Sequence, residues 1–267
     1  MKKLTIITVC LNIASTIERT CQSIVNQTFQ DFEWIVVDGA STDGTLQILE
    51  KYRNRIDILI SEPDKGIYNA MNKGIKLASG EYVNFMNGGD EFYDNDVLAK
   101  VFNGKEYDAD VIYGRTYMVG KNYIKEPKII MNKQAFYKNN IVHQSAFTKT
   151  VLQKKYLFDE TLKICSDYDF FVKILFKGFT FKYINIIVSK FDTGGISETN
   201  RQLGINEISI IRKRYYNFIL KIKYDPKWKQ KLNHYIMILT HPRYVAGWIK
   251  RKIKNMFNKT QKQLTNT

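Results

Sequence analysis

The sequence is poor in the residues that interrupt compact structure. It has only 4 prolines and 15 glycines among 267 residues, which argues against a linker-rich or low-complexity architecture. Its three cysteines, Cys10, Cys21 and Cys165, are scattered and odd in number, so they indicate neither a disulfide framework nor a zinc site. We expect buried or neutral thiols in a reducing compartment.

Long apolar runs and several nucleotide motifs are also missing. No apolar stretch approaches the roughly 20 residues needed to span a bilayer. The loop VCLNIAS after the first apolar run lacks glycine, which excludes the G-x-G-x-x-G dinucleotide pattern. Neither G-x-x-x-x-G-K-[ST] nor G-x-S-x-G occurs, which excludes the NTPase phosphate-binding loop and the common hydrolase elbow.

Charge is distributed unevenly along the chain. The net charge is +15, of which residues 1–200 carry +1 and residues 201–267 carry +14. A neutral body argues against a whole-domain nucleic-acid binder. Within 242–259, apolar residues recur at helical spacing between basic residues, which is typical of an amphipathic helix lying on an anionic membrane. The alternative is a helix that packs on the domain with a solvated basic face.

The first hundred residues alternate apolar runs with amphipathic segments. With 44% hydrophobic residues the chain is typical of a globular protein. We predict strands at 4–9, 32–38, 56–61 and 81–86, and helices at 15–26, 45–53 and 67–78. This order implies an α/β fold with a parallel, doubly wound sheet and right-handed crossovers. Ligands of such sheets bind at the carboxyl ends of the strands.

Polar residues gather where these predicted strands end. Asp38 ends an apolar run, where an unpaired charge is costly; it either accepts from a base N–H or ribose hydroxyl, or caps the amides of its own turn. Asp90 follows two glycines, which allow close approach to phosphates, and its carboxylate is suited to a divalent metal. The alternative for Asp90 is an ordinary Gly-Asp turn.

Three blocks together resemble family 2 glycosyltransferases, above all the bacterial branch that builds O-antigen, capsule and exopolysaccharide. They are VDGASTDGT (37–45), SEPDKGIYNAMNKGIKLASGEYVNFMNGGD (61–90) and SDYDFFVKI (166–174). The resemblance covers about residues 3–200. It implies a GT-A fold, which is a mostly parallel sheet flanked by helices. The expected domains are a catalytic domain over 1–200, with a nucleotide-sugar half to about 115 and an acceptor half over 116–200, and a basic helical region over 201–267.

The resemblance also assigns roles to residues. It implies inverting, metal-dependent transfer from a nucleotide-sugar, with Asp38 reading the base and Asp167 acting as general base. The nucleotide-binding positions that it implies are Thr8, Val9, Asn12, Asp38, Asp64, Lys65 and Gly89. Asp90 would hold Mn²⁺ or Mg²⁺ on the donor diphosphate. The usual Asp-x-Asp cluster here reads Asn87-Gly88-Gly89-Asp90 with one carboxylate, and His143 is either a further metal ligand or a hydrogen-bonded structural residue.

Geometry distinguishes the two acidic residues of the third block. Asp167 and Asp169 lie two positions apart, about 200° around a helix, so they cannot face one site. The resemblance assigns the catalytic role to Asp167, which also lies at the expected helix start, and leaves Asp169 structural or favouring the helix dipole; the alternative is that both merely cap the helix.

The sequence therefore predicts an inverting transferase that moves a sugar from a nucleotide-sugar, most often a UDP-sugar, to a lipid-linked or growing surface glycan. We expect a peripheral protein on the cytoplasmic face of the membrane, with a polyprenyl-diphosphate-linked or glycan acceptor and no nucleic-acid partner. The rival functions are a nucleotidyltransferase on a similar fold and a non-catalytic module that binds nucleotide-sugar or glycan.

Overall fold

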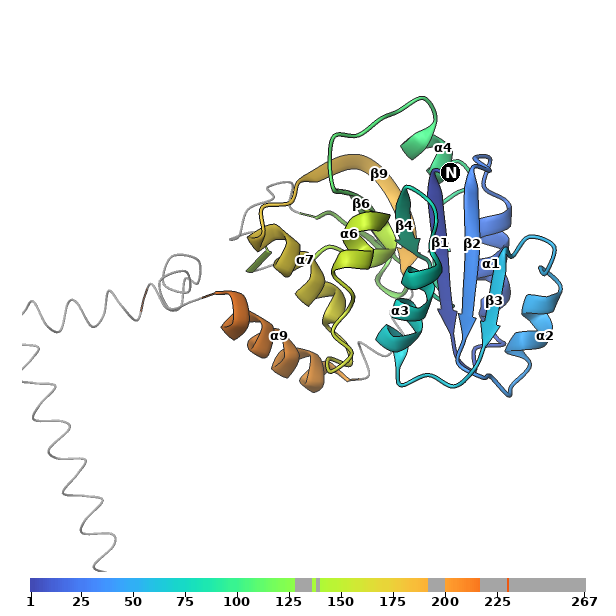
Figure 1. Ribbon diagram of the computed structural model, residues 1–267, viewed down its shortest axis with the longest axis horizontal. Helices are drawn as coiled ribbons and strands as arrows, with labels where there is room; N and C mark the ends of the chain where they lie inside the picture. The colour runs from blue at the N-terminus through green and yellow to red at the C-terminus, as the bar shows by residue number, and fades with distance from the viewer. Residues whose placement is uncertain (128–135, 138–139, 192–199, 217–229, 231–267) are drawn as a thin grey trace, which may run out of the picture. The chain divides into compact units, whose positions relative to one another are not determined.

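The computed structural model describes residues 1–127, 136–137, 140–191, 200–216 and 230 (Figure 1). The chain divides into two compact units, Met1–Tyr215 and Tyr216–Thr267. The basic segment 242–259 lies outside the described residues. Within the described parts, no helix has the length and apolar character that a membrane span requires.

Four parallel strands form the first half of the sheet. β1 (Leu4–Cys10), β2 (Phe32–Asp38), β3 (Ile58–Ser61) and β4 (Tyr82–Phe85) lie in the order β3-β2-β1-β4. Every residue of β1, β2 and β4 is buried, which explains their nearly continuous apolar sequences. Cys10 pairs with Asp38, and Asp38 pairs with Ser61, so these three strands end level with one another.

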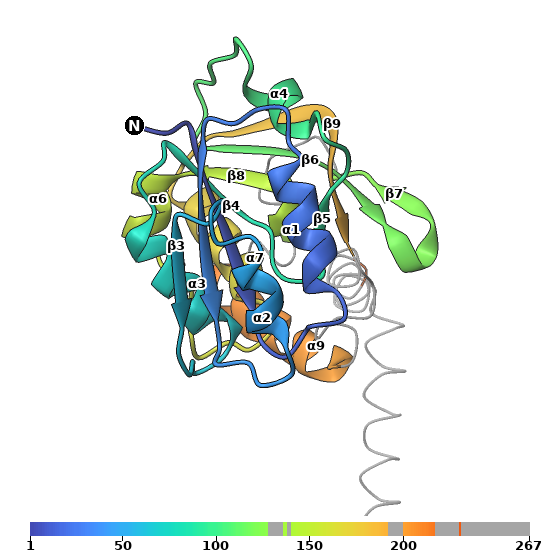
Figure 2. The same cartoon turned by 90° about the vertical axis from the view of Figure 1, so that its right-hand side faces the viewer.

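Helices cover both faces of this parallel part (Figures 1 and 2). α1 (Ile17–Val25) and α2 (Thr45–Glu50) share a buried apolar cluster with alternate residues of β1 and β2, including Ile6 and Trp34. α3 (Ile67–Leu77) packs on the other face. A Cβ atom at Gly74 of α3 would lie 2.6 Å from Ile7 Cγ2, so glycine permits this close approach.

The second half of the sheet mixes strand directions. β8 (Ala146–Lys149) pairs antiparallel with β4 and with β6 (Val111–Met118), and β6 pairs parallel with β9 (Phe181–Phe191). β5 (Glu91–Phe92) adds to β9, and β7 (Tyr123–Lys125) forms a hairpin with β6. Among the described strands, parallel pairing without a register shift is found in β3-β2-β1-β4, whereas the parallel β6-β9 pair contains register shifts near Arg115. The regular strand-helix alternation of the sequence ends there, so the sheet grows by later strands of either direction.

The remaining helices complete the first unit. They are α4 (Val97–Phe102), α6 (Thr150–Lys155), α7 (Ser166–Phe176) and α9 (Arg201–Tyr215), with 3-10 turns η1 (Val119–Lys121) and η2 (His143–Ser145). α9 packs against α7. The first unit thus includes α9 and ends at Tyr215.

The predicted elements of the first hundred residues are present, and several of them are shorter than predicted. The helix expected over 45–53 ends at Glu50, and the strand expected from residue 56 begins at Ile58. The helix carrying Asp167 begins at Ser166, which confirms that Asp167 lies in the first turn.

Candidate functional site

Hydrogen bonds join the loops that follow β1 and β2. The Asn12 backbone N–H donates to Ser41 Oγ at 2.8 Å, and the Thr42 N–H donates to Asn12 Oδ1 at 2.9 Å. Asn12 has φ +50°, a left-handed conformation that asparagine tolerates better than most residues. The Asn12 side chain is exposed at this edge, so the structure brings it to the predicted nucleotide side of the sheet.

Asp38 is buried and is bonded by its own neighbours. Its Oδ2 accepts from the Ser41 N–H at 3.0 Å and from the Ser61 hydroxyl at 2.7 Å. Its Oδ1 accepts from the Ser41 hydroxyl and lies 3.6 Å from Cys10 Sγ. Burial, reinforced by the Asp38 charge, raises the pKa of the Cys10 thiol. Asp38 therefore caps its own turn and ties β2 to β3, and its predicted contact with the base stays a prediction.

Asp64 joins the same edge from the loop after β3. Its Oδ1 accepts from the Gly66 N–H at 2.7 Å, just before α3 begins. A Cβ atom at Gly39 would lie only 2.6 Å from Asp64 Oδ2, so the two loops touch where Gly39 lacks a side chain. Lys65 is exposed, and its backbone N–H donates to Asn69 Oδ1 at 3.2 Å.

Thr8 and Val9 lie inside the fold. The Thr8 side chain is fully buried and accepts from Trp34 Nε1 at 3.0 Å, so it belongs to the core rather than to a pocket wall. Side chains along β1 point alternately to the two faces of the sheet, and Thr8 lies on the face that carries Trp34. Val9 is also buried, and its carbonyl accepts from the Gly88 N–H at 3.0 Å. The backbone carbonyl of Val9 thus holds the turn at Gly88, which follows β4.

Hydrogen bonds hold the Asn87–Asp90 turn against α1. Gly89 has φ +95°, which glycine adopts without strain. Its N–H donates to Thr20 Oγ1 at 2.9 Å, and its carbonyl accepts from the Arg19 guanidinium at 2.8 Å. The Asp90 N–H donates to the Asn87 carbonyl at 3.0 Å. These bonds fix the backbone that carries the predicted metal ligand.

The turn η2 links Asp90, the predicted metal ligand, with Asp167, the predicted general base. His143 Nδ1 lies 3.1 Å from Asp167 Oδ2, and His143 Nε2 lies 3.1 Å from Asn87 Nδ2. The next residue, Gln144, donates from Nε2 to Asp90 Oδ2 at 2.7 Å. With the Asn87 amide oriented this way, the neutral imidazole with its proton on Nδ1 satisfies both His143 contacts. His143 is therefore arranged as a hydrogen-bonded link between Asn87 and Asp167.

Buried hydrogen bonds hold η2 in place. Asn84 of β4 donates to the Gln144 carbonyl at 3.0 Å and to the Ala146 carbonyl at 2.9 Å. The Ser145 hydroxyl lies 2.7 Å from both Thr116 Oγ1 and Ser189 Oγ. Because these partners lie on three strands of the sheet, the positions of His143 and Gln144 are set by the sheet itself.

Asp167 accepts hydrogen bonds on both oxygens. Its Oδ1 accepts from the Tyr168 N–H at 2.8 Å and from the Tyr68 hydroxyl at 3.4 Å. Burial, reinforced by the Asp167 charge, raises the pKa of Tyr68 well above its usual value, so this hydroxyl remains a donor. Asp169 faces elsewhere: it bonds Arg214 at 2.7 Å and pairs with Lys173 at 3.2 Å. The expectation that the two aspartates cannot share a site is confirmed.

The surroundings of Asp90 suit a hard cation. Two buried amide oxygens close to it in the hydrogen-bond network, Asn87 Oδ1 and Gln144 Oε1, have no hydrogen-bond partner within the described residues. Carboxylate and amide oxygens are ligands that Mg²⁺ and Mn²⁺ accept. Among the described residues no three His, Cys, Asp or Glu side chains converge as a metal cluster. A metal here would therefore need further oxygen ligands from water or substrate.

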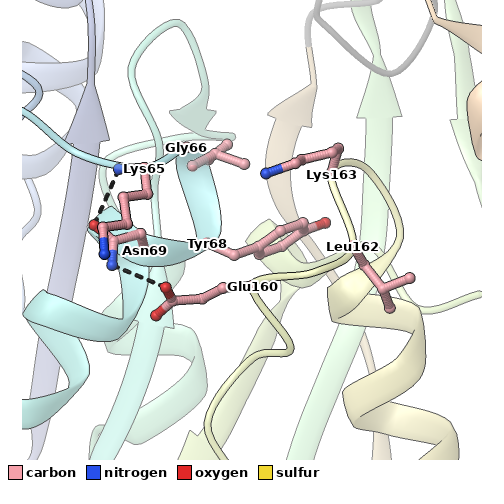
Figure 3. Close-up of a pocket in the computed structure, with 8 residues that line it drawn as sticks. Lys65, Gly66, Tyr68, Asn69, Glu160, Leu162 and Lys163 are labelled. Carbon is pink, nitrogen blue, oxygen red and sulfur yellow. Dashed lines mark hydrogen bonds between the residues drawn. The ribbon is translucent and has the colours of Figure 1, made fainter.

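A cavity of about 180 Å³ opens beside Tyr68 (Figure 3). The start of α3 forms one wall, and the loop 160–163 forms the other. The Lys163 side chain points across the cavity toward Gly66, above the Tyr68 ring (Figure 3). Glu160 is bonded to Asn69 at 2.9 Å and to Asn72 at 2.8 Å. Two lysines, Lys65 and Lys163, thus line a cavity whose aromatic wall reaches Asp167.

The sequence analysis missed several residues of this site. Tyr68 and Gln144 gave no signal, because their partners Asp167 and Asp90 are 99 and 54 residues away. Lys125 was not predicted as a site residue either. It pairs across the hairpin with Thr116 and so shares the face on which Thr116 contacts η2. Burial lowers the pKa of Lys125, and the nearby Asp167 charge opposes that shift.

Comparison with known proteins identifies the family. Residues 5–159 match the family model described as Glycosyl transferase family 2. A PGL/p-HBAD biosynthesis glycosyltransferase of Mycobacterium bovis is 29% identical over 225 residues, which are 77% of this chain and 88% of the relative. The poly(ribitol-phosphate) beta-N-acetylglucosaminyltransferase TarP of Staphylococcus aureus is 28% identical over 236 residues, covering 80% of this chain and 72% of TarP.

Solved structures share the fold. S. aureus TarS 1-349 in complex with UDP-GlcNAc superposes with a TM-score of 0.68 at 22% identity, covering 86% of this chain and 69% of that one. The mannosyltransferase PcManGT of Pyrobaculum calidifontis, in complex with GDP-Man and Mn²⁺, gives a TM-score of 0.62 at 18% identity, covering 97% and 88%. The described sheet and its flanking helices thus form a fold of the GT-A type.

Proposed function

Because the chain belongs to glycosyl transferase family 2, we propose that it is an inverting transferase that moves a sugar from a UDP-sugar to a hydroxyl of a lipid-linked or growing surface glycan. The observation that carries this proposal is the η2 link. One short turn holds Asp90 through Gln144 and Asp167 through His143. A diphosphate-binding carboxylate and a general base are the two groups that such a transfer needs close together.

In this proposal Asp167 takes the proton from the acceptor hydroxyl as that oxygen attacks the anomeric carbon. Attack from the face opposite the leaving nucleoside diphosphate inverts the anomeric centre. His143 and the Tyr168 N–H orient the carboxylate, each on its own oxygen. Tyr68 stays protonated and lies 3.4 Å from Asp167 Oδ1, but its single proton is donated to the Ile164 carbonyl at 2.6 Å. A positioned base of this kind contributes about 10²–10⁴-fold to the rate.

On the donor side, Asp90, with the amide oxygens of Asn87 and Gln144, would hold a divalent cation. When bound, that cation would offset the charge that develops on the leaving diphosphate. The proposed nucleotide-binding positions on this edge of the sheet are Asn12, Asp64, Lys65 and Gly89. Asp38 supports that edge through Ser41 and Ser61.

The cavity beside Tyr68 is the proposed entry for the acceptor. It combines an aromatic wall with polar groups, a lining suited to a polar, ring-shaped ligand. Its Tyr68 wall bonds the proposed base, so a hydroxyl placed there would approach Asp167. TarP, by its name, acts on poly(ribitol-phosphate), and the two lysines of the cavity are compatible with an acceptor that carries phosphate.

A thermal-shift panel tests the donor assignment. We would measure UDP, GDP, CMP and dTDP, each with and without Mn²⁺, on the wild type and on Asp90→Ala. Ligand at about 100 times its Kd stabilises the folded state by about 2.7 kcal/mol. The expected result is a Mn²⁺-dependent shift with UDP that is lost in Asp90→Ala. The absence of a shift with any nucleotide would overturn the donor site and favour a glycan-binding module.

Membrane association is a separate part of the proposal. The net charge of +14 in residues 201–267 and the helical apolar spacing in 242–259 support a peripheral protein on the anionic cytoplasmic face of the membrane. Sedimentation with vesicles of 30% phosphatidylserine, compared with pure phosphatidylcholine, tests it. We expect binding to the anionic vesicles only, and loss of binding when salt screens the charges. Equal recovery in the supernatant with both vesicles would contradict it.

A further inference from the structure

Glu207 of α9 is a buried acid that lies outside both the matched family region and the site described above. Only 4% of its surface is exposed. Its Oε1 accepts from the Lys163 N–H at 2.6 Å. Its Oε2 accepts from the N–H groups of Ile164 and Cys165, each at 2.9 Å. One carboxylate thus binds three consecutive backbone donors.

These three donors belong to the segment that leads directly into α7. The helix begins at Ser166, and Asp167 follows in its first turn. Backbone N–H groups before a helix have no partner inside it, and leaving them unbonded when buried is costly. Glu207 therefore fixes the backbone of residues 163–165. Because this backbone leads directly into α7, it also determines where Asp167 lies. The Ile164 carbonyl in this segment also accepts from the Tyr68 hydroxyl at 2.6 Å.

The same helix α9 makes a second contact with α7. Arg214, two turns after Glu207, bonds Asp169 Oδ1 at 2.7 Å and Asp159 Oδ2 at 3.0 Å. Asp169 has no exposed surface, so Arg214, whose side chain is 39% exposed, supplies a buried carboxylate with a partner of opposite charge. α9 thus contacts the start of α7 at two points. Glu207 bonds the backbone of residues 163–165, and Arg214 bonds the side chain of Asp169.

We propose that Glu207 is a positioning residue for the transfer reaction, acting through the 163–165 backbone to hold Asp167 against His143 and Tyr68. This inference rests on the proposed function, because it takes Asp167 as the general base. Glu207 touches neither Asp167 nor the cavity directly. Its effect also reaches the cavity wall, because the Lys163 N–H that it binds belongs to a cavity-lining residue (Figure 3).

The test compares Glu207→Gln with Glu50→Gln. Gln keeps the volume but replaces one acceptor oxygen with an NH₂ group, which opposes the backbone donors. Glu50 lies on α2, is exposed and makes no side-chain hydrogen bond within the described residues, so it is the matched control. Activity is expressed per folded molecule, below the melting transition of the less stable variant.

We expect Glu207→Gln to lower kcat at least tenfold while the UDP-induced thermal shift and the donor KM stay near wild type. Glu207→Asp, which keeps the charge on a shorter stem, should recover part of the loss. Glu50→Gln should match the wild type in every assay. A Glu207→Gln enzyme with a lower melting temperature but wild-type kcat per folded molecule would overturn the proposal, because that is the result of a purely structural role.

A second measurement does not depend on turnover. The chain has 3 histidines, so the imidazole nitrogen resonances can be assigned by His143→Phe. We expect the Nδ1 resonance of His143 to change in Glu207→Gln, because Asp167 has moved, and to stay unchanged in Glu50→Gln. An unchanged His143 resonance would overturn the positioning role. A wild type that binds no nucleotide and transfers no sugar, with the resonance change still present, would instead show that the proposed function has failed.

Discussion

His143 Nδ1 lies 3.1 Å from Asp167 Oδ2, and the opposite nitrogen of the same ring lies 3.1 Å from Asn87. One imidazole thus connects the turn that carries Asp90 with the helix that carries Asp167. Both ring nitrogens are engaged by protein groups, so in this arrangement His143 orients the base. A role as metal ligand would require one of these two bonds to break.

Asp167→Asn should abolish most turnover. The amide cannot take the acceptor proton, so we expect kcat to fall by about 10²–10⁴-fold with an unchanged UDP-induced thermal shift. The measurement is nucleoside diphosphate release under saturating donor. Asp108→Asn, at an exposed position, is the control. If Asp167→Asn kept wild-type kcat, another residue would have to be the base.

His143→Phe should lower kcat without changing the metal requirement. A hydrogen bond to a charged group contributes about 1.5–3 kcal/mol, so its loss predicts a fall in kcat of about 10–100-fold. The half-saturating Mn²⁺ concentration should stay at the wild-type value. A large rise in that concentration, with kcat restored at high Mn²⁺, would instead make His143 a metal ligand.

Lys125→Gln should weaken catalysis, because it removes a positive charge that acts on Asp167. A charge interaction of about 1.4 kcal/mol corresponds to a tenfold loss of kcat/KM. Burial lowers the pKa of Lys125, so the wild-type enzyme should lose this contribution at a lower pH than an ordinary lysine would. Lys125→Arg keeps its charge and should extend the alkaline limb of the pH profile. Lys182→Gln, at an exposed position on β9, should have no effect.

Gly39→Ala should damage the donor edge. The added Cβ atom would lie 2.6 Å from Asp64 Oδ2 and 3.2 Å from Leu11 Cδ1, so the side chains of Asp64 and Leu11 must shift away from the loop after β2. We expect weaker UDP binding in a titration, with a loss of stability of about 1–3 kcal/mol. Gly104→Ala is a contrasting variant: its Cβ atom would meet nothing within 4 Å, but its φ of +63° adds backbone strain. Equal UDP affinity in Gly39→Ala and wild type would contradict the close packing.

The stability of the fold should decrease above about pH 9. Burial raises the pKa of Cys21 and of Cys165 to about 12, from an ordinary value of 9.0. Between these values the unfolded chain releases protons that the folded chain keeps, so the free energy of unfolding falls as pH rises. Urea unfolding at pH 8 and pH 10 measures this change, and Cys21→Ala should reduce it. At pH 8 the native thiols should resist alkylation, and rapid reaction of all three would refute their burial.

The sequence by itself determined the first half of the fold. Continuous apolar runs in 4–9 and 32–38 required strands buried on both faces, and their alternation with amphipathic segments required parallel crossovers. That topology alone places the ends of β1, β2, β3 and β4 on one edge. The opposite orientations of Asp167 and Asp169 likewise followed from helical periodicity, because their angular separation is fixed by the backbone.

Only the tertiary structure decided how these groups work together. Thr8 looked like a site residue by position, yet its alternation along β1 puts it against Trp34 in the core. The bonds from Tyr68 and His143 to Asp167, and from Glu207 to the backbone before it, join segments 99, 24 and 42 to 44 residues apart. Such contacts leave no periodic trace in the sequence, since they depend on which faces of distant elements meet when the sheet and α9 pack. Local hydrophobic pattern therefore specifies the strands and helices, whereas long-range packing of buried polar groups specifies the site.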